Sequence, residues 1–358
     1  MSRRERLKRV QEELVHLRLD AILITDGFNL QYLTGFSDVG GDGCLLISQS
    51  SYWMITDARY ETAMASDLPA DVRLLITRDY YGQVATLVER EQMTVVGFED
   101  TLPYVIWAQL DEQLTADFVG MHAIVDHLRE IKDETEIMAL RHAIALSSQG
   151  YDEVMPTIVA GMTEIEVANR LDGWMRAHGS TGPSFATIVA SGSRAAQPHA
   201  AATNKRLQQG ELVTIDFGFY FDGYTSDITR TFAIGYVDEA LKRIYDLTLA
   251  ANQAVIAAIK PGVSGAELDA AGRNIIIAGG YGSQFNHGMG HGIGLNIHEE
   301  PQVYGPRTPY QLSANQVITV EPGIYVPDHG GVRIEDDVLV TENGAEVLTS
   351  SPKTLQVI

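Results

Sequence analysis

The sequence predicts an α/β domain over residues 1–125 followed by an α+β domain over residues 126–358. Three observations predict this organisation. The length of 358 residues is about twice that of a typical domain. Short apolar runs alternate with helical patterns in the first third of the chain, which is typical of a mixed or mostly parallel sheet. The pattern then changes to long helices and long strand-like runs.

The first domain shows its elements in regular order. Residues 3–18 have the apolar spacing of an amphipathic helix, and apolar runs bounded by turn residues predict buried strands. The expected strands are DAILIT (20–25), GCLLIS (43–48), YWMIT (52–56), VRLLIT (72–77) and TVVGFE (94–99). The further expected helices are a short one from Ala58, one near 82–92 and one around 104–116.

The second domain begins with one long helical pattern over residues 126–154. Two more helices are indicated by capping boxes, Thr163 with Glu166 and Ser264 with Glu267. The long strand-like runs lie at 211–234 and 316–341. This combination predicts helices that cover one face of an antiparallel sheet.

Composition excludes several classes of protein. The formal net charge of -21 disfavours nucleic-acid binding, because an acidic surface repels phosphate backbones. The single cysteine, Cys44, excludes an internal disulfide and a thiolate metal cage, and its apolar surroundings favour a buried structural thiol. The basic N-terminus lacks an apolar signal core, and no apolar run approaches the roughly 20 residues of a membrane span. We therefore expect a cytoplasmic protein without membrane association.

One hairpin brings two aspartates together. In LVTIDFGFYFDGYTSDITRTF (212–232), the central Asp-Gly pair is favoured in a two-residue turn. That turn sets a register in which Asp216 faces Thr229 and Asp227 faces Gly218. The two aspartates become diagonal neighbours on one face, and Gly218 is expected to leave open space beside them. A polar sheet face with two solvated aspartates and a site for a pair of divalent ions both remain open at this point.

Two glutamates lie in apolar strand-like runs near the C-terminus. Glu321 belongs to VITVEPGIYV and Glu335 to GVRIEDDVLV. Buried carboxylates without partners are costly, so both side chains are expected to meet a cation. Arg333 is an alternative partner for one of them. The length of the loop between the runs does not fix which faces the glutamates share.

The segment HGMGHGIGLNIHEEP (287–301) carries three histidines separated mostly by glycine. The glycines disfavour a helix, so these histidines are expected on strands or loops. One imidazole with four carboxylates is an oxygen-rich, hard ligand set, which suits Mn²⁺ or Co²⁺ better than a structural zinc ion.

Taken together, IDFG…TSDITRTF, HGMGHGIGLNIHEEP, VEPGIY and GVRIEDD resemble the motifs of the metal-dependent "pita-bread" peptidases in order and spacing. This family contains methionine aminopeptidase, aminopeptidase P and prolidase. Upstream, YLTGF and TDARY are similar to the N-terminal domain of the aminopeptidase P and prolidase branch. The resemblance implies a creatinase-like N-terminal domain and a C-terminal pita-bread (creatinase/aminopeptidase) domain.

The resemblance also implies a metal centre with two divalent ions, with Mn²⁺ the first expectation and Co²⁺ or Zn²⁺ the alternatives. The implied ligands are Asp216, Asp227, His291, Glu321 and Glu335. The carboxylates carry four negative charges and two divalent ions carry four positive ones, which lets such a cluster exist away from bulk water.

Further residues receive roles from the same resemblance. Glu321 is expected to act as general base, and His298 and His199 are expected to contact the scissile peptide and stabilise the developing oxyanion. His199 by itself would be read as a surface loop histidine. His287, Tyr325 and Arg333 are expected to line the substrate pocket.

The branch favours cleavage of peptides with proline in the second position. We expect an Xaa-Pro aminopeptidase, with an Xaa-Pro dipeptidase (prolidase) as the alternative and a non-catalytic binding protein on the same fold as a third reading. A homodimer acting on peptides is expected. Asp38, Trp53 and Arg59 are candidates for reaching a partner's active site, although an ordinary role in the fold is favoured for each.

Overall fold

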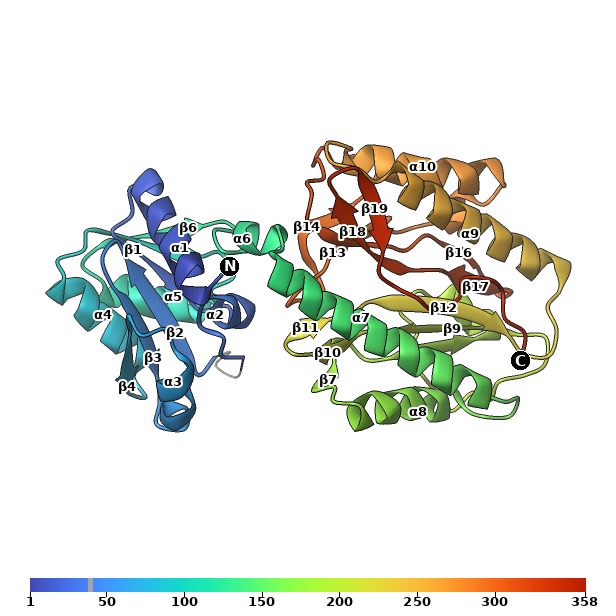
Figure 1. Cartoon of the computed structure of the whole chain (residues 1–358), viewed down its shortest axis with the longest axis horizontal. Coiled ribbons are helices and arrows are strands. Elements are labelled where there is room, and N and C mark those ends of the chain that lie inside the picture. Colours follow the sequence, from blue (N-terminus) through green and yellow to red (C-terminus); the bar gives the residue numbers. More distant parts are fainter. Residues whose placement is uncertain (38–40) are drawn as a thin grey trace. The chain divides into compact units, whose positions relative to one another are not determined.

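The computed structural model describes residues 1–37 and 41–358, and of residues 302 and 303 only the backbone. Asp38 therefore lies outside the described residues. The chain forms two compact units, Met1–Arg129 and Glu130–Ile358 (Figure 1). The sequence analysis placed the boundary after residue 125. In the described residues, no helix has both the length and the apolar character that a membrane span requires.

The first unit is built around one six-stranded mixed sheet with the strand order β4-β3-β2-β1-β5-β6. Its strands are β1 (Ala21–Ile24), β2 (Gly43–Ser48), β3 (Tyr52–Thr56), β4 (Val72–Ile76), β5 (Val95–Glu99) and β6 (Asp117–Met121). Its helices are α1 (Arg3–Leu17), α2 (Gly27–Thr34), α3 (Glu61–Asp67), α4 (Tyr80–Arg90) and α5 (Tyr104–Gln113), and α6 (Asp126–Glu130) ends it. The pairs β1–β5, β3–β4 and β5–β6 are parallel, and the two pairs that β2 makes are antiparallel.

The strands predicted from apolar runs are all present in this unit, and β1, β2 and β3 are buried along their whole length. Cys44 is buried in this core, as predicted, and burial raises the pKa of its thiol to about 12. Trp53 is also buried here, and Arg59 forms a bidentate pair with Asp57. Trp53 is thus buried and Arg59 is exposed, and a role of either residue in a partner's active site stays a prediction. The sequence analysis missed α2 and β6.

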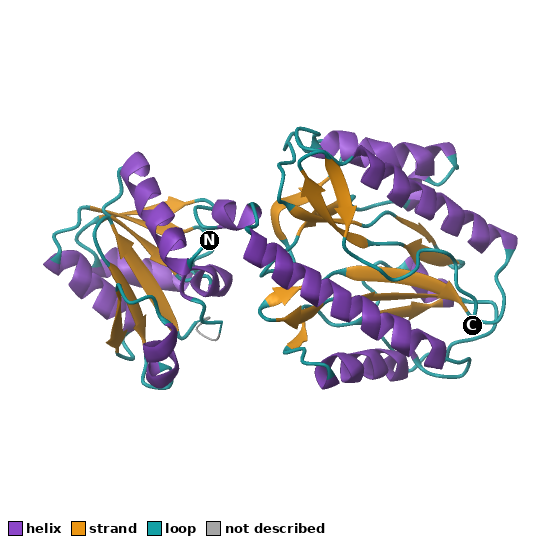
Figure 2. Cartoon of the chain, in the orientation of Figure 1, coloured by secondary structure: helices purple, strands orange, loops and turns teal. Residues whose placement is uncertain are grey.

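The second unit contains four long helices and a set of antiparallel strands (Figure 2). The helices are α7 (Glu134–Val154), α8 (Glu164–Ala177), α9 (Glu239–Ala258) and α10 (Gly265–Ala278), with short 3-10 turns at Met155–Thr157, Gly192–Ala196 and Gly282–Gln284. The first strands are β7 (Gly182–Pro183), β8 (Ile188–Ser191), β9 (Leu212–Phe217), β10 (Phe219–Phe221), β11 (Tyr224–Thr225) and β12 (Ile228–Ala233). The later strands are β13 (Gly290–Gly292), β14 (Glu299–Tyr304), β15 (Val317–Val320), β16 (Gly323–Val326), β17 (Gly330–Arg333), β18 (Asp336–Thr341) and β19 (Gly344–Val347).

The expected single helix over 126–154 is wrong, because the chain breaks between α6 and α7. Asp133 is the cause. Its side chain accepts the backbone N–H of Thr135 and of Glu136, and the Glu136 side chain accepts the N–H of Asp133 in return. This capping box starts a new helix at Glu134. The two capping boxes predicted at Thr163 and Ser264 are confirmed at the starts of α8 and α10.

Two hydrophobic cores hold this unit together. One lies between α7, α8 and the sheet β12-β9-β8. The other lies between α9, α10 and the strands β15 to β18. Figure 1 shows the strands of the unit between α8 on one side and α9 and α10 on the other. The named strands of this unit pair in antiparallel fashion, as predicted.

The hairpin register predicted from the Asp-Gly turn is confirmed, because Asp216 pairs with Thr229 and Tyr220 pairs with Thr225. The expectation of open space at Gly218 is wrong. A Cβ atom there would lie 2.3 Å from the carbonyl oxygen of Ser226 and 2.4 Å from Ser184 Oγ. The glycine therefore permits close approach of neighbouring segments, and the ladder is interrupted at this point.

Candidate metal centre and active site

The aspartate pair lies at the interruption of the β9–β12 hairpin. Asp216 belongs to β9, and Asp227 immediately precedes β12. Both are buried, at 8% and 5% exposure. The interruption frees the backbone N–H of Asp227 from the ladder, and this N–H donates to Asp337 Oδ2 at 3.0 Å. The bond fixes the backbone from which the Asp227 carboxylate projects.

The two glutamates face each other across a second hairpin. Val320 pairs with Asp336 on one side of them, and Gly323 pairs with Arg333 on the other. This shared register places Glu321 opposite Glu335, a relation that the sequence left undetermined. Neither residue belongs to a strand, so their backbone groups are satisfied elsewhere. Glu321 donates its N–H to the Met289 carbonyl at 2.9 Å, and Glu335 donates to the Thr229 carbonyl at 3.1 Å.

His291 is the central residue of the short strand β13. Its flanking glycines have a steric reason, since a Cβ at Gly290 would lie 2.1 Å from the Thr319 carbonyl and one at Gly292 would lie 2.3 Å from the Glu300 carbonyl. The Nδ1 atom of His291 donates to the Gly292 carbonyl at 3.0 Å. That bond leaves Nε2 with its lone pair available as a metal ligand.

The five expected ligands surround one cavity of about 280 Å³. Ligand atoms of Asp227, His291 and Glu335 lie within 4.8 Å of one another. His291 Nε2 is 3.5 Å from Asp227 Oδ2 and 3.8 Å from Glu321 Oε1. Asp216 lines the same cavity. Its Oδ1 atom is buried and has no hydrogen-bond partner among the described residues, which is what an absent cation would satisfy.

The electrostatics of this cluster favour an added positive charge. Burial raises the pKa of Asp227, and the nearby carboxylates of Asp216, Asp337 and Glu321 raise it further. Burial likewise raises the pKa of Glu335 well above its ordinary value, followed by the charge of Asp227. The residues present therefore fit a divalent cation site, because a cation would relieve this repulsion and supply the missing partner.

Three more histidines contact the cavity, as the resemblance implied. His199 and His298 line it, and both residues are solvent-exposed. The His298 ring lies 4.3 Å from the His291 ring between centroids. Burial lowers the pKa of His298 to about 4, assisted by the neighbouring His291 and His199. His287 also lines the cavity, and burial lowers its pKa to about 4.

Arg333 connects the pocket residues to the carboxylates. Its guanidinium donates to Asp216 Oδ2 at 2.5 Å and to the Tyr325 hydroxyl at 2.9 Å. Tyr325 lies behind the cavity wall and is buried, so it contacts the site through Arg333 and His287. Arg333 Nε also donates to Thr229 Oγ1 at 3.1 Å, and Thr229 donates to Glu335 Oε2 at 2.6 Å. The sequence analysis gave no role to Thr229, although its pairing with Asp216 was the available signal.

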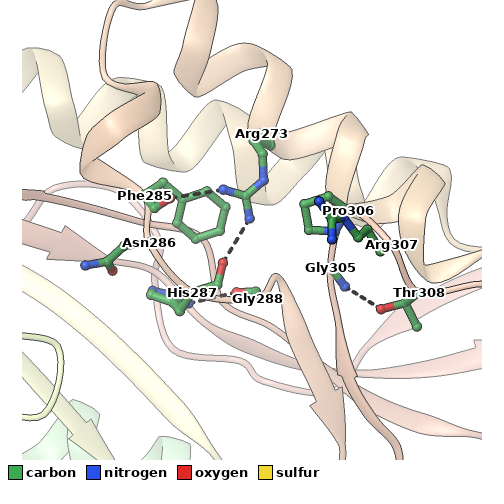
Figure 3. A pocket seen from close by; sticks show the side chains of 9 residues that line it. All are labelled: Arg273, Phe285, Asn286, His287, Gly288, Gly305, Pro306, Arg307 and Thr308. Carbon is green, nitrogen blue, oxygen red and sulfur yellow. Dashed lines mark hydrogen bonds between the residues drawn. The ribbon is translucent and has the colours of Figure 1, made fainter.

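A second, larger cavity adjoins the first. It has a volume of about 520 Å³ and shares His287 and Gly288 with the metal cavity. Arg273 and Arg307 line it (Figure 3). Arg273 pairs with Asp269 at 2.7 Å, whereas Arg307 is exposed. Because Arg273 is paired with Asp269, Arg307 is the arginine of these two that can meet a negatively charged group in this cavity.

The chain matches two family models, described as "Creatinase/Prolidase N-terminal domain" over residues 6–131 and "Metallopeptidase family M24" over residues 138–342. It is 36% identical over 353 residues to the Xaa-Pro dipeptidase of Pyrococcus horikoshii, with 98% of each chain covered. The solved structure of the Xaa-Pro dipeptidase from Bacillus anthracis is similar with a TM-score of 0.95 and 39% identity, covering 100% of both chains. The X-Pro aminopeptidase from Thermotoga maritima is similar with a TM-score of 0.89 and 34% identity, covering 97% of this chain and 99% of that one.

Proposed function

The chain belongs to metallopeptidase family M24, and on that premise we propose that it is an Xaa-Pro dipeptidase with a centre for two divalent ions. Membership confirms the resemblance and the fold class predicted from the sequence, and it makes the chain a metal-dependent peptidase. The observation that carries the proposal is the single cavity lined by Asp216, Asp227, His291, Glu321 and Glu335. These are the five ligands that we assign. The sequence analysis favoured an aminopeptidase, and the dipeptidase relatives favour its alternative.

The assigned ligand set is rich in carboxylate oxygen, so Mn²⁺ is our first candidate, with Co²⁺ and Zn²⁺ as alternatives. Two such ions, held by these five residues, would lower the pKa of a bound water and polarise a peptide carbonyl. The surrounding residues hold the ligands in position. Thr229 orients the Glu335 carboxylate, and the Nδ1–H of His291 fixes the imidazole so that Nε2 faces the cavity.

Proton transfer is assigned to Glu321. Burial raises the pKa of this carboxyl, and its side chain is partly open to the cavity, where it can accept and return a proton. We assign it to take the proton from the attacking water and to pass it to the leaving nitrogen. His298 and His199 are assigned to donate hydrogen bonds to the oxygen on which negative charge develops. The lowered pKa keeps His298 neutral at pH 7, so it donates without adding charge.

The cavity that adjoins the metal cavity favours the proposal of a dipeptide as the substrate. A dipeptidase must bind the free carboxylate that lies one residue beyond the scissile bond, and a longer peptide has no charge at that position. Arg307 lines the cavity that shares His287 and Gly288 with the metal cavity. We assign Arg307 to bind the substrate carboxylate, because a guanidinium can donate two parallel hydrogen bonds to it.

The test compares an Xaa-Pro dipeptide with its C-terminal amide and with Xaa-Pro-Yaa tripeptides. We expect efficient hydrolysis of the dipeptide and a KM at least about tenfold higher for the amide, since a charged hydrogen bond contributes about 1.5–3 kcal/mol. Arg307→Gln should raise the KM for the dipeptide toward that for the amide and leave the KM for the amide unchanged. Arg243→Gln is the matched control, an exposed arginine elsewhere in the same unit. A preference of the wild-type enzyme for the tripeptide would contradict the dipeptidase assignment.

An Xaa-Pro aminopeptidase is the second candidate, favoured by the similarity to the X-Pro aminopeptidase from Thermotoga maritima. The same peptide panel decides between the two. We also propose a cytoplasmic homodimer, as the sequence led us to expect, and light scattering of the purified protein tests the dimer. A monomer that retains full activity would contradict it.

A further inference from the structure

Arg273 of α10 is partly buried, and its guanidinium makes four directed hydrogen bonds. Its Nε and Nη2 atoms pair with both oxygens of Asp269, at 2.7 and 2.8 Å. Nη1 donates to the Phe285 carbonyl at 3.0 Å, and Nη2 donates to the His287 carbonyl at 2.9 Å. Figure 3 shows the guanidinium directed at this loop. Asp269 is only 1% exposed, so the guanidinium is anchored from one side and holds the loop with the other.

The same loop is held by ring contacts. The Arg273 guanidinium carbon lies 4.1 Å from the centroid of the Phe285 ring. The Phe285 ring meets the His287 ring edge to face, at 4.9 Å and 83°. These contacts act on the ring of His287, while the hydrogen bond to its carbonyl acts on its backbone. Both parts of His287 are therefore fixed from the side of α10.

Hydrogen bonds also connect the His287 ring to residues of the metal cavity. Its Nδ1 donates to the Gly288 carbonyl at 2.7 Å, so its Nε2 accepts the hydroxyl proton of Tyr325 at 2.8 Å. The Tyr325 hydroxyl accepts from Arg333 at 2.9 Å, and Arg333 donates to Asp216 at 2.5 Å. An unbroken series of contacts thus runs from α10 to Asp216.

We propose that Arg273 is a positioning residue for the active site. Its guanidinium holds residues 285–288 so that the His287 imidazole presents Nε2 to Tyr325, and the bond through Tyr325 and Arg333 orients Asp216. The proposal rests on the proposed function, since His287 and Asp216 are assigned there to the pocket and the metal centre. Arg273 itself does not line the metal cavity, so it acts on the active site through His287.

The arrangement requires arginine. The planar guanidinium pairs with both Asp269 oxygens and still has donors directed at two backbone carbonyls. A lysine ammonium at this position keeps the charge and reaches Asp269 or one carbonyl, and it cannot reproduce the four bonds. Arg273→Lys therefore separates the charge of Arg273 from its geometry.

A different role would be direct binding of substrate, because Arg273 lines the larger cavity together with Arg307. Direct binding and positioning predict different kinetics. Loss of a direct contact raises KM, and it does so whether or not His287 is present. Loss of positioning lowers kcat, and it has no further effect once the imidazole of His287 has been removed.

The kinetic test is a double-mutant cycle on the holoenzyme with an Xaa-Pro dipeptide. We expect Arg273→Lys to lower kcat about tenfold with KM changed less than about twofold. In a His287→Ala background the same substitution should change kcat less than about twofold. Additive losses in the two backgrounds, or an effect confined to KM, would overturn the proposal. Arg243→Lys, which replaces an exposed arginine that donates to the Gly279 carbonyl, serves as the matched control.

A second measurement does not depend on activity or on metal. The long-range ¹H–¹⁵N spectrum of metal-free protein at fixed pH reports the tautomer of each imidazole, and the His287 signals are assigned by their absence in His287→Ala. We expect the Nδ1-protonated tautomer in the wild type and in Arg243→Lys, and a mixture of tautomers in Arg273→Lys. An unchanged His287 tautomer in Arg273→Lys would refute positioning. If the protein failed to hydrolyse Xaa-Pro dipeptides, this spectrum would still decide the proposal.

Discussion

Glu335 and Asp336 are neighbours in sequence and are both buried, yet their surroundings are opposite. Asp336 accepts from Arg230 and from Lys353, each at 2.8 Å. Burial alone would raise its pKa, and these two cations outweigh burial and lower it. Glu335 accepts from the neutral hydroxyl of Thr229, and its pKa is raised well above its ordinary value by burial and by the charge of Asp227.

The difference shows how two adjacent residues serve two purposes, since Glu335 precedes β18 and Asp336 is its first residue. On the Asp336 side, the fold neutralises a buried carboxylate with its own cations. On the Glu335 side, four carboxylates line one cavity together with the guanidinium of Arg333, which pairs with Asp216. Uncompensated charge is expensive in a protein interior, so its presence on one face only indicates a function for that face.

Removal of the negative charge of Glu335 is expected to have the largest effect on activity and metal binding. We expect Glu335→Gln to lower kcat and Mn²⁺ affinity more than about 100-fold, since loss of a residue that merely supports a ligand already costs 10–100-fold. The metal-free variant should unfold at the same temperature as the wild type or higher, because a repulsive carboxylate is gone. Calorimetric metal titration, peptide hydrolysis and thermal melting check the three parts. Full turnover in Glu335→Gln or in Asp227→Asn would contradict the site.

The corresponding substitution of Asp336 should lower stability and leave metal binding nearly unchanged. Asp336→Asn leaves Arg230 buried with its charge unpaired, and loss of one partner of a buried pair costs about 3–5 kcal/mol. Urea unfolding of the metal-free variant measures this loss. The folded fraction should still bind Mn²⁺ with nearly wild-type affinity. If Asp336→Asn and Glu335→Gln behaved alike in both measurements, the distinction between the two faces would be wrong.

The sequence predicted the β9–β12 hairpin because local chemistry sets its register, and an Asp-Gly turn leaves few alternatives. It could not predict that Glu321 faces Glu335, because that relation depends on a hairpin with a longer turn. The same limit applies to Asp336. Its partners Arg230 and Lys353 lie 106 and 17 positions away, so its neutralised environment could not be predicted from local sequence.

The sequence indicated the candidate ligands, but it did not indicate the residues that hold these ligands in position. Ligand types favoured a metal centre, and the family resemblance implied each ligand. The supporting contacts of Thr229 and Arg273 depend on tertiary packing. A threonine in a strand and an arginine in a helix are common residues whose role appears only once the neighbouring segments are in place.

A smaller effect is expected on the pH dependence of the melting temperature of metal-free protein, which also distinguishes Glu335 from Asp336. In metal-free protein the raised pKa values of Asp227 and Glu335 mean that the native state keeps protons which the unfolded chain has released above about pH 4. The resulting stability is fully present below the unfolded pKa and is lost as pH rises through the raised native pKa. The melting temperature of metal-free protein should therefore fall by a few degrees, roughly 2–4 °C per kcal/mol, between pH 5 and pH 8. Glu335→Gln should flatten this slope.

Asp336→Asn is the control for that slope. The pKa of Asp336 is lowered, so this carboxyl is ionised in both states between pH 5 and pH 8 and adds nothing to the pH dependence there. Its variant should melt lower at every pH with the wild-type slope. Added Mn²⁺ should raise the melting temperature more at pH 8 than at pH 5, because binding requires the deprotonated carboxylates. A pH-independent melting temperature in the stripped wild type would show that the Glu335 side carries no excess charge, and the surroundings of Glu335 and Asp336 would then be equivalent.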